Sequence, residues 1–394
     1  MTFKSQFNNS TTQRFNNNIM KLSHLIFTST IFLFLASCAE KNESGFPVYD
    51  LVELSEPETV LLSSVCDNIE YVPLETGNEI LGNITGIRYS AGRYAVQSGS
   101  SISVFDNMGK LLYILDKQGR GPDEYAYASV FDINRIGEIL VYDSAKDRLL
   151  FYNSTGEVIR EIKNLEGTSG IRLFGDDRIF LTGPIYTGTN KISEAMINLE
   201  GDTLMAIPNK FLFQPSILVM FRFECVTYTR GDKLFYHEVM DDTIYWVDNN
   251  MEISPYAVLN TGDRRFTPEK RSNISLTEPP DAVVVNDIIE TENHFLVECR
   301  GNETLVDKNT GPIIVVRDKG FLNDLDGGRP FSPDLLVDDK YLVQVVDAFE
   351  FNLWLESDHF KNFSDDPEKK DEFRALAERL TENDNPVLVK CRVK

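Results

Sequence analysis

The sequence predicts an all-β fold, a six-bladed β-propeller with four-stranded blades. Three observations lead to it: hairpins that recur along the chain, a second strand pair before each hairpin, and strand-like segments at both ends that complete one more blade. A repeat of roughly 40–50 residues with four strands per unit is typical of propellers. Because a single blade cannot bury its own faces, such repeats must pack against one another.

Residues 1–37 are expected to precede the fold, as an upstream extension and a lipoprotein signal peptide. Residues 1–19 are polar and rich in Asn, and Met20, the expected true start, is followed by Lys21 and the apolar run Leu22–Ala36. That run is shorter than the roughly 20 apolar residues that span a bilayer. A charged start, an apolar core and small residues before a cut are features of a signal peptide.

The segment Leu35-Ala36-Ser37-Cys38 resembles the lipobox of bacterial lipoproteins. The resemblance implies that Cys38 is acylated, becomes the mature N-terminus and makes the lipid bilayer a partner. It also implies a bacterial cell-envelope location, anchored to the outer membrane and facing the periplasm or the surface. Several acyl chains would hold the protein there without a spanning helix. Residues 38–53 are then expected to be a tether, and residues 54–394 the propeller.

The chain is acidic, with a net charge of -22 over 394 residues. Residues 1–37 hold three cations and no carboxylate, so the mature chain has 36 cations against 61 carboxylates, a net charge of -25. Nucleic acid is therefore not an expected partner. Besides Cys38 there are four cysteines and no Cys-x-x-Cys pair, so a zinc ribbon is not indicated. In an oxidising compartment these four could form disulfides or stay buried and free.

Five hairpins are visible as alternating apolar runs around a tight turn. The turn residues expected to adopt positive φ are Gly109, Gly156, Gly201, Asn250 and Gly311. The last interval is longer than the others, and the segment from Thr261 to Pro280 accounts for the difference. Another strand pair precedes each hairpin, so five four-stranded blades are predicted.

The sixth blade is expected to combine strands from both ends of the chain. Leu336–Phe349 supplies two strands, Asn385–Lys394 a third, and Ile69–Glu75 the fourth. Such a blade fixes the ring against opening. Between these strands one amphipathic helix is predicted, after the candidate cap Ser364, because Phe373, Leu376, Ala377 and Leu380 follow helical spacing.

Four motifs resemble a family of lipid-anchored six-bladed β-propeller proteins of bacterial envelopes, related in pattern to NHL-repeat propellers. They are "YVPLET", "GRGPDEY", "NDLDGGRPF" with Pro333 soon after, and the final "DNPVLVKCRVK". The resemblance extends from about Leu54 to Lys394. It implies the fold and the envelope location, and it supplies no reaction.

The segment "LDKQGRGPDEY", Leu115–Tyr125, looks like a phosphate-binding loop. Such a loop needs a helix N-terminus after it, whereas the residues that follow here alternate as strands. We therefore interpret the segment mainly as a connection between two blades, with Gly119 and Gly121 making tight turns. Since propeller connections lie on a ligand-binding face, Arg120, Asp123 and Glu124 remain ligand-binding candidates.

The segment "NDLDGGRPF" offers hard oxygen atoms on a flexible turn, the ligands that Ca²⁺ prefers. Asn323, Asp324 and Asp326 are the candidate metal ligands, and Asp324, Asp326 and Arg329 are candidate ligand-binding residues. The alternative, which we favour, is an Asx-rich turn in which Arg329 pairs with a carboxylate. Calcium is thus a possible cofactor, and no other cofactor is expected.

No catalytic constellation stands out. The sequence contains neither His-Glu-x-x-His nor Gly-x-Ser-x-Gly. We therefore expect a non-catalytic binding scaffold for a glycan, a peptide or an envelope partner protein. The alternatives are a lyase or hydrolase acting on polysaccharide or peptide with channel-facing Arg, Tyr and carboxylates, and a structural subunit with an apolar patch on its rim.

Overall fold

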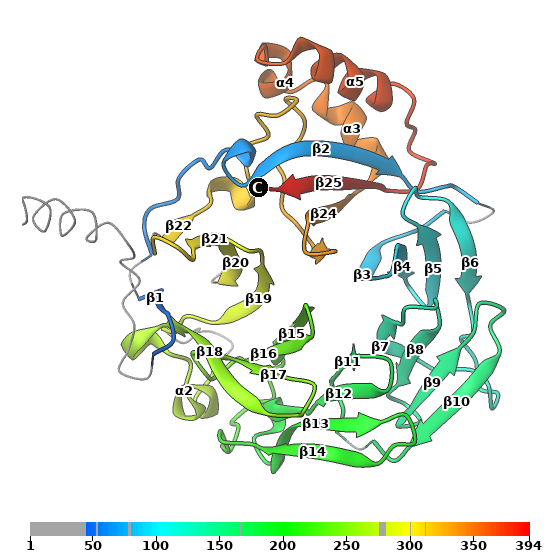
Figure 1. The fold of residues 1–394 in the computed structure, drawn as a ribbon, viewed down its shortest axis with the longest axis vertical. Helices are drawn as coiled ribbons and strands as arrows, with labels where there is room; N and C mark the ends of the chain where they lie inside the picture. Colours follow the sequence, from blue (N-terminus) through cyan, green and yellow to red (C-terminus); the bar gives the residue numbers. More distant parts are fainter. Residues whose placement is uncertain are drawn as a thin grey trace, which may run out of the picture.

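The computed structural model describes residues 45–394, except residues 53, 78–79, 166, 222, 276–280, 300 and 312. The signal peptide and the acylation site Cys38, both predicted from the sequence, lie outside the described residues. Six β-sheets stand around a central axis like the blades of a propeller (Figure 1). The six-bladed, all-β architecture expected from the repeat is confirmed.

Five blades follow one another along the chain, and each is an antiparallel four-stranded meander. Blade 1 consists of β3 (Ile84–Ser90), β4 (Arg93–Ser98), β5 (Ser101–Asp106) and β6 (Leu111–Leu115). Blade 2 consists of β7 (Ala128–Ile133), β8 (Ile139–Asp143), β9 (Arg148–Tyr152) and β10 (Val158–Lys163). Blade 3 consists of β11 (Gly170–Phe174), β12 (Arg178–Thr182), β13 (Ile192–Asn198) and β14 (Thr203–Pro208).

Blade 4 consists of β15 (Cys225–Arg230), β16 (Lys233–Glu238), β17 (Thr243–Val247) and β18 (Ile253–Asn260). Blade 5 consists of β19 (Val285–Glu290), β20 (His294–Cys299), β21 (Asn302–Asp307) and β22 (Ile313–Val315). The first strand of each blade lies innermost and contacts the first strands of the neighbouring blades. The axis is therefore surrounded by first strands only.

Blade 6 joins the two ends of the propeller. Its strands are β23 (Leu335–Val337), β24 (Tyr341–Val346), β25 (Val387–Val393) and, outermost, β2 (Cys66–Pro73). The antiparallel pair β2–β25 places Ile69 opposite Cys391 and Pro73 opposite Val387. The predicted closure of the ring by N- and C-terminal strands is confirmed.

A short strand lies where the sequence predicted only a tether. β1 (Val48–Asp50) pairs in parallel with β18, so that blade 4 has five strands. Tyr49 and Leu51 are buried in the apolar cluster between blades 4 and 5. The propeller therefore begins before residue 54, because these two apolar side chains cover the outer edge of blade 4.

The hairpin turns adopt the expected backbone in four of the five blades. Gly109, Gly156, Gly201 and Gly311 all have positive φ. In the turn of blade 4 the residue with positive φ is Met251, with φ 63°, and not the predicted Asn250. Here the Asp248 carboxylate accepts the backbone N–H groups of Asn250 and Glu252, at 2.8 Å each, and this fixes the turn one residue later.

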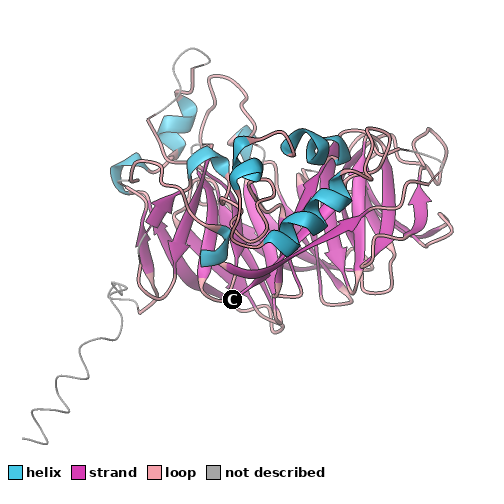
Figure 2. Cartoon of the chain, turned by 90° about the horizontal axis from the view of Figure 1, so that it is seen from above, coloured by secondary structure: helices cyan, strands magenta, loops and turns pink. Residues whose placement is uncertain are grey.

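The helices gather on one face of the disc (Figure 2). Between β24 and β25 lie three helices, α3 (Ala348–Trp354), α4 (Asp358–Asn362) and α5 (Pro367–Ala377), where one had been predicted. α5 buries Phe373, Leu376 and Ala377 as expected, but its cap is Asp366 and not Ser364, since Pro367 occupies the first helical position. α2 (Pro268–Ser272) follows β18. Within the described chain no helix is long and apolar enough to cross a membrane.

Candidate functional site

The central channel contains a cavity of about 1040 Å³. Its wall is made by the innermost strands of all six blades and by the loops that enter them. A cavity of this size is at the upper end of the range of small-molecule sites.

One wall of the cavity is acidic. In blades 5 and 6, including the segment that leads into α3, it carries the carboxylates of Asp287, Glu298, Asp334, Asp347 and Glu350. Asp347 is exposed and makes no capping bond to α3, although it stands at the N-cap position. The acidic wall thus offers an exposed carboxylate to a ligand at its rim.

The opposite wall is polar and mostly neutral. Blades 1–3 line it with hydroxyl and amide side chains: Asn83, Thr85, Gln97, Ser129, Ser169 and Thr182. Two guanidinium groups, those of Arg88 on β3 and Arg172 on β11, also reach the lining. Arg172 donates to the carbonyl of Thr227 at 2.9 Å and lies 3.9 Å from Asp132. The cavity therefore has an acidic side and a hydrogen-bonding side.

Arg329 is the one sequence-predicted candidate that lines this cavity. Its guanidinium forms an ion pair with Glu350, and both side chains are 30% exposed. The pairing with a carboxylate that the alternative interpretation expected is present. The pair belongs to the acidic wall and neutralises one of its carboxylates.

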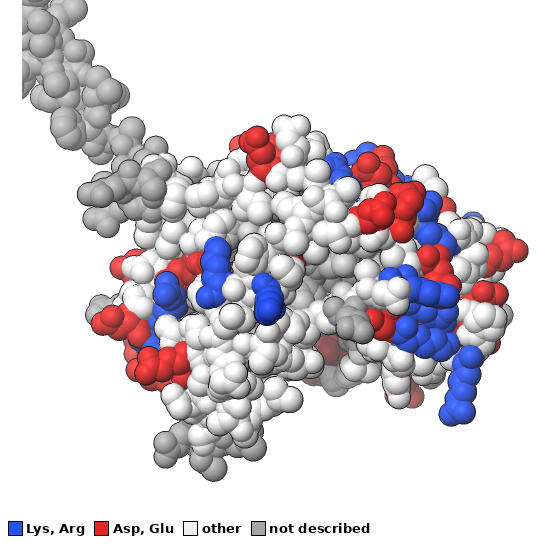
Figure 3. Space-filling model, turned by 90° about the horizontal axis from the view of Figure 1, so that it is seen from below, with Lys and Arg blue, Asp and Glu red and all other residues white. Residues whose placement is uncertain are grey.

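An uncharged loop, Phe211–Phe221, forms the lip of the cavity on the helix-bearing face. Met220 and Phe221 line the cavity, while Leu212, Leu218 and Met220 are 54%, 68% and 67% exposed. In Figure 3 charged side chains gather toward the two sides of the rim and leave a broad uncharged area between them. Such exposure of large apolar side chains is a feature of binding surfaces.

The lip is held rigidly from below by Arg271 of α2. Its guanidinium donates to both oxygens of Glu224 at 2.7 Å and to the carbonyl of Val219 at 2.9 Å. The rings of Phe213, Phe221 and Phe266 surround it, at 5.2 to 5.8 Å from the guanidinium carbon. Both members of the ion pair are almost fully buried. The exposed apolar side chains thus project from a fixed support.

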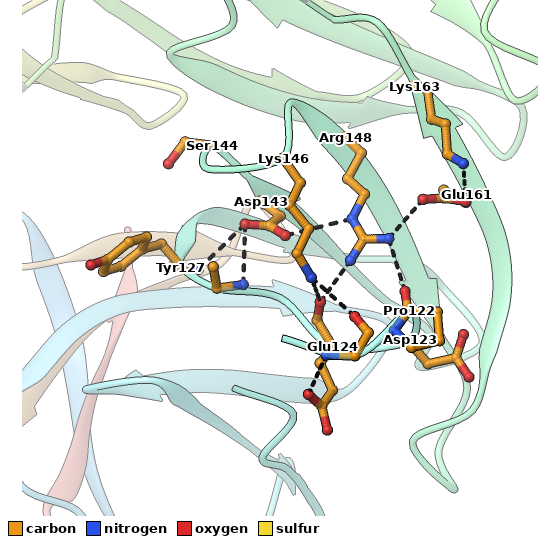
Figure 4. Close-up of polar contacts among 12 residues, drawn as sticks. Pro122, Asp123, Glu124, Tyr127, Asp143, Ser144, Lys146, Arg148, Glu161 and Lys163 are labelled. Atoms are coloured by element: carbon orange, nitrogen blue, oxygen red, sulfur yellow. Dashed lines mark hydrogen bonds and ion pairs between the residues drawn. The ribbon is translucent and has the colours of Figure 1, made fainter. Parts of the chain in front are cut away.

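The segment "LDKQGRGPDEY" connects β6 of blade 1 to β7 of blade 2. Arg148 of β9 donates to the carbonyls of Pro122 and Glu124 at 2.8 and 2.7 Å, and Lys146 donates to the Glu124 carbonyl at 2.9 Å (Figure 4). Tyr125 is fully buried and donates to the carbonyl of Ser100 at 2.6 Å. The interpretation of this segment as a connection between blades agrees with the structure.

The candidates Arg120, Asp123 and Glu124 do not line the cavity. Arg120 and Asp123 are exposed, and the Glu124 carboxylate turns back to accept the N–H of Gly121 at 2.7 Å. A Cβ atom on Gly119 would lie 1.9 Å from this carboxylate. Neither glycine has positive φ. At Gly119 the carboxylate occupies the space of a side chain, a reason for glycine that sequence reasoning missed.

The turn "NDLDGGRPF" contacts both the start of the propeller and the insertion, the helical segment α3–α5 between β24 and β25, where Trp354 donates to the Gly327 carbonyl at 3.0 Å. Asp324 accepts the backbone N–H of Ser63 at 2.8 Å, and Asp326 accepts the Tyr71 hydroxyl at 2.7 Å and the Gly328 N–H at 2.8 Å. Among the described residues no group of three His, Cys, Asp or Glu side chains could hold a metal ion. The carboxylates are occupied by protein donors, so the geometry lends no support to calcium, which stays a prediction.

Two groups of buried carboxyls were not foreseen. Glu303, opposite Glu298 on the neighbouring strand, accepts the Ser332 hydroxyl at 3.0 Å, and burial raises the pKa of Glu303 to about 8. Glu194 of β13 and Glu238 of β16 meet between blades 3 and 4, where burial raises the pKa of Glu194 well above its usual value and that of Glu238 to about 7. Glu298 and Glu303 belong to one hairpin, whereas Glu194 and Glu238 come from different blades, which no local sequence pattern brings together.

A family model described as "Domain of unknown function (DUF4934)" matches residues 46–392. The chain belongs to the DUF4934 family. The match covers all six blades and the insertion. The chain matches none of the curated proteins with which it was compared.

Two solved structures from Bacteroides resemble this DUF4934 protein. One, from Bacteroides fragilis, is assigned as an exported protein; it is 20% identical with a TM-score of 0.66, over 88% of this chain and 99% of the other. The second is a member of the DUF4221 family from Bacteroides vulgatus, 14% identical with a TM-score of 0.47, over 84% and 97%. At these identities the first likeness supports the fold alone, and the second carries no argument.

Proposed function

We propose that this DUF4934 protein is a lipoprotein of the bacterial cell envelope, anchored to the outer membrane through acylated Cys38, whose propeller binds a ligand without transforming it. The cavity of about 1040 Å³ in the channel is the observation that carries the proposal. It combines a concave polar site with a rigid apolar lip, the combination that small-molecule and peptide sites use.

The ligand is a peptide segment that carries a basic side chain. A cationic group matches the acidic wall of blades 5 and 6, and electrostatic complementarity of this kind favours both encounter and selectivity. Peptide amide groups match the hydroxyl and amide side chains of blades 1–3. An apolar residue next to the basic one would pack on Met220 and Phe221 at the lip.

The proposed lipid anchor at Cys38 lies only a few residues before the first strand of the propeller. β1 lies on the outer edge of blade 4, within the residues predicted as the tether. Six residues lie between Cys38 and Gly45, so the Cα atoms of these two residues can be at most about 25 Å apart in a fully extended chain. An acylated Cys38 would therefore keep the rim of blade 4 close to the bilayer.

Melting experiments test the ligand class. Trilysine and triglutamate are added in turn to the purified protein, and we expect only trilysine to raise the melting temperature, since a ligand that binds only the folded state stabilises it. Glu298→Gln and Asp347→Asn should remove that shift. Glu382→Gln, an exposed carboxylate outside the cavity lining, is the matched control and should leave the shift unchanged.

Other outcomes of the same melts would redirect the proposal. A shift caused by a neutral oligosaccharide and not by trilysine would replace the peptide by a glycan. No shift from either would leave a folded envelope protein, docking on the lip, as the partner. Adding Ca²⁺ and then EDTA in parallel tests the calcium prediction at Asp324 and Asp326.

An enzyme is the second candidate, and Glu303 is the residue that favours it. With its pKa raised to about 8, Glu303 stays protonated at neutral pH beside Ser332, which lines the cavity. A protonated carboxylic acid beside a binding cavity is a possible general acid. A lyase or hydrolase that uses it would lose turnover in Glu303→Gln while keeping ligand affinity, whereas a binding protein would show no turnover in either form.

A further inference from the structure

Two of the four described cysteines lie on the strands that close the ring. Cys66 is the first residue of β2, and Cys391 lies near the end of β25. Both are fully buried as free thiols. The other two, Cys225 on β15 and Cys299 on β20, belong to different blades and to different apolar clusters.

The register brings the thiols of Cys66 and Cys391 to the same place. Cys66 lies opposite Val393, and Cys391 lies opposite Ile69. An irregularity between Cys66 and Asn68 breaks the alternation of side chains, so that Cys66 and Ile69 are buried in the same cluster as Cys391. Burial raises the pKa of the Cys391 thiol well above its usual value, and the neighbouring Cys66 thiol adds to that rise.

The closure is otherwise non-covalent. Its contacts include the β2–β25 ladder, an exposed ion pair between Asp67 and Arg392, and the bond from the Lys394 N–H to the Val65 carbonyl at 3.1 Å. Every blade except blade 6 takes its four antiparallel strands from one continuous stretch of the chain, and blade 4 gains β1 in addition. The pair β2–β25 is therefore the junction where a covalent bond would constrain the fold most.

We propose that Cys66 and Cys391 form a disulfide bond that closes the propeller ring covalently. The two Sγ–H groups lose two protons and two electrons as the Sγ–Sγ bond forms. The electrons pass to a disulfide oxidant, which is reduced to a dithiol. Compartments outside the cytosol supply oxidants of this class.

The bond forms during folding rather than afterwards. In the closed ring both thiols are fully buried, so an oxidant has no access to them. Burial also raises the pKa of the Cys391 thiol well above its usual value, and the thiolate is the reactive form. Oxidation therefore has to accompany the docking of β25 beside β2.

The bond should stabilise the folded state strongly. Cys66 and Cys391 enclose nearly all of the propeller, and the entropy removed from the unfolded chain by a cross-link increases with the length of the enclosed loop. Reduction should lower the melting temperature by several degrees without opening the ring, because the ladder and the apolar cluster remain.

Peptide mapping tests the proposal directly. The full chain is refolded in a buffer of oxidised and reduced glutathione, free thiols are blocked with N-ethylmaleimide in denaturant, and the protein is digested without reduction. We expect one linked peptide that contains Cys66 and Cys391, with Cys225 and Cys299 blocked as free thiols. The same map of protein extracted from the cell envelope should give the same pair. The proposal would be overturned by natively folded protein in which all four thiols are blocked by N-ethylmaleimide. Disulfides between other pairs of cysteines would overturn it as well.

Two double variants distinguish the effect of the disulfide on the melting temperature from the effect of losing buried side chains. The difference in melting temperature between oxidised and reduced protein should disappear in the double variant Cys66→Ala, Cys391→Ala. It should persist in the matched control Cys225→Ala, Cys299→Ala, which also removes two buried thiols. Equal differences in the two double variants would contradict a Cys66–Cys391 bond. Ligand binding in the channel is a separate measurement and does not decide this one.

Discussion

Arg271 is the single residue on which the lip of the cavity depends most. Arg271→Ala leaves the Glu224 carboxylate buried without its partner, which typically costs about 3–5 kcal/mol. Urea unfolding should show this loss. Arg264→Ala, which removes a partly exposed ion pair with Asp281, is the control and should cost less than about 1 kcal/mol. Similar losses in both variants would contradict a special role for the buried pair.

Gly119 is predicted to be intolerant of a side chain. In Gly119→Ala the new Cβ would overlap the Glu124 carboxylate, which must then give up its hydrogen bond from the Gly121 N–H, at about 1–3 kcal/mol. Gly82→Ala places a Cβ 3.4 Å from the Ser98 hydroxyl and should be nearly neutral. Thermal melting compares the two. A nearly neutral Gly119→Ala would show that the Glu124 carboxylate can move at no cost.

At the residue scale, the conformation of a single residue can be predicted from the sequence more readily than the contacts between residues. The four turn glycines follow from local rules, because positive φ is a property of one residue. Arg329 was found as a candidate, yet its position in the acidic wall depends on a helix that the sequence did not reveal. The Glu194–Glu238 pair joins two blades, and no local pattern marks it.

At the scale of elements, the contact between blades 3 and 4 should respond to pH. The pKa values of Glu194 and Glu238 are raised in the folded state, so their contribution to stability is present below about pH 4.5 and is lost as the pH rises through about 7. Glu303 acts in the same direction, with its pKa at about 8. The melting temperature should therefore fall between pH 5 and pH 8.5.

His237 acts in the opposite direction. Burial lowers its pKa to about 4, so its contribution to stability is present above about pH 6.5 and is lost as the pH falls toward 4. One histidine is outweighed by three carboxyls between pH 5 and pH 6.5. The double variant Glu194→Gln, Glu238→Gln should flatten the pH dependence above pH 6. An unchanged slope in that variant would assign the effect to other groups.

Elements with a strict period were predictable, and elements held by tertiary contacts were not. The hairpins alternate in hydrophobicity and recur, so their existence follows from the sequence. α3 and α4 are short, and their buried residues Ala348, Phe351 and Phe360 are too few to show helical spacing. β1 is three residues long and acquires its conformation from β18.

For the whole molecule, ring closure should decide cooperativity. Deleting residues 387–394 removes β25, which separates β2 from β24, and we expect loss of the single sharp unfolding transition. Deleting residues up to 52 removes only β1 and the segment before it, so the ring should stay closed and unfold in one step at a lower temperature. Calorimetry distinguishes the two. A sharp transition without β25 would show that five blades suffice.

The architecture was predictable because strand patterns remain at both ends of the sequence after the five complete blades are assigned. These remaining strands indicate a sixth blade that closes the ring. The cavity was not predictable, since its acidic wall arises from blades 5 and 6 and the insertion together. Charge composition indicates an acidic protein. It does not reveal on which wall of the channel the carboxylates collect.

The position of β25 in blade 6 also has a consequence for biosynthesis. β2 must wait for β25, which is synthesised only after the strands of the other five blades, before its own blade can form. Until then the nascent chain exposes an incomplete sheet and is not trapped in a finished tertiary structure. A polypeptide whose tertiary structure is completed only after its last blade strand has been made is suited to passage through a translocation pore in the unfolded state.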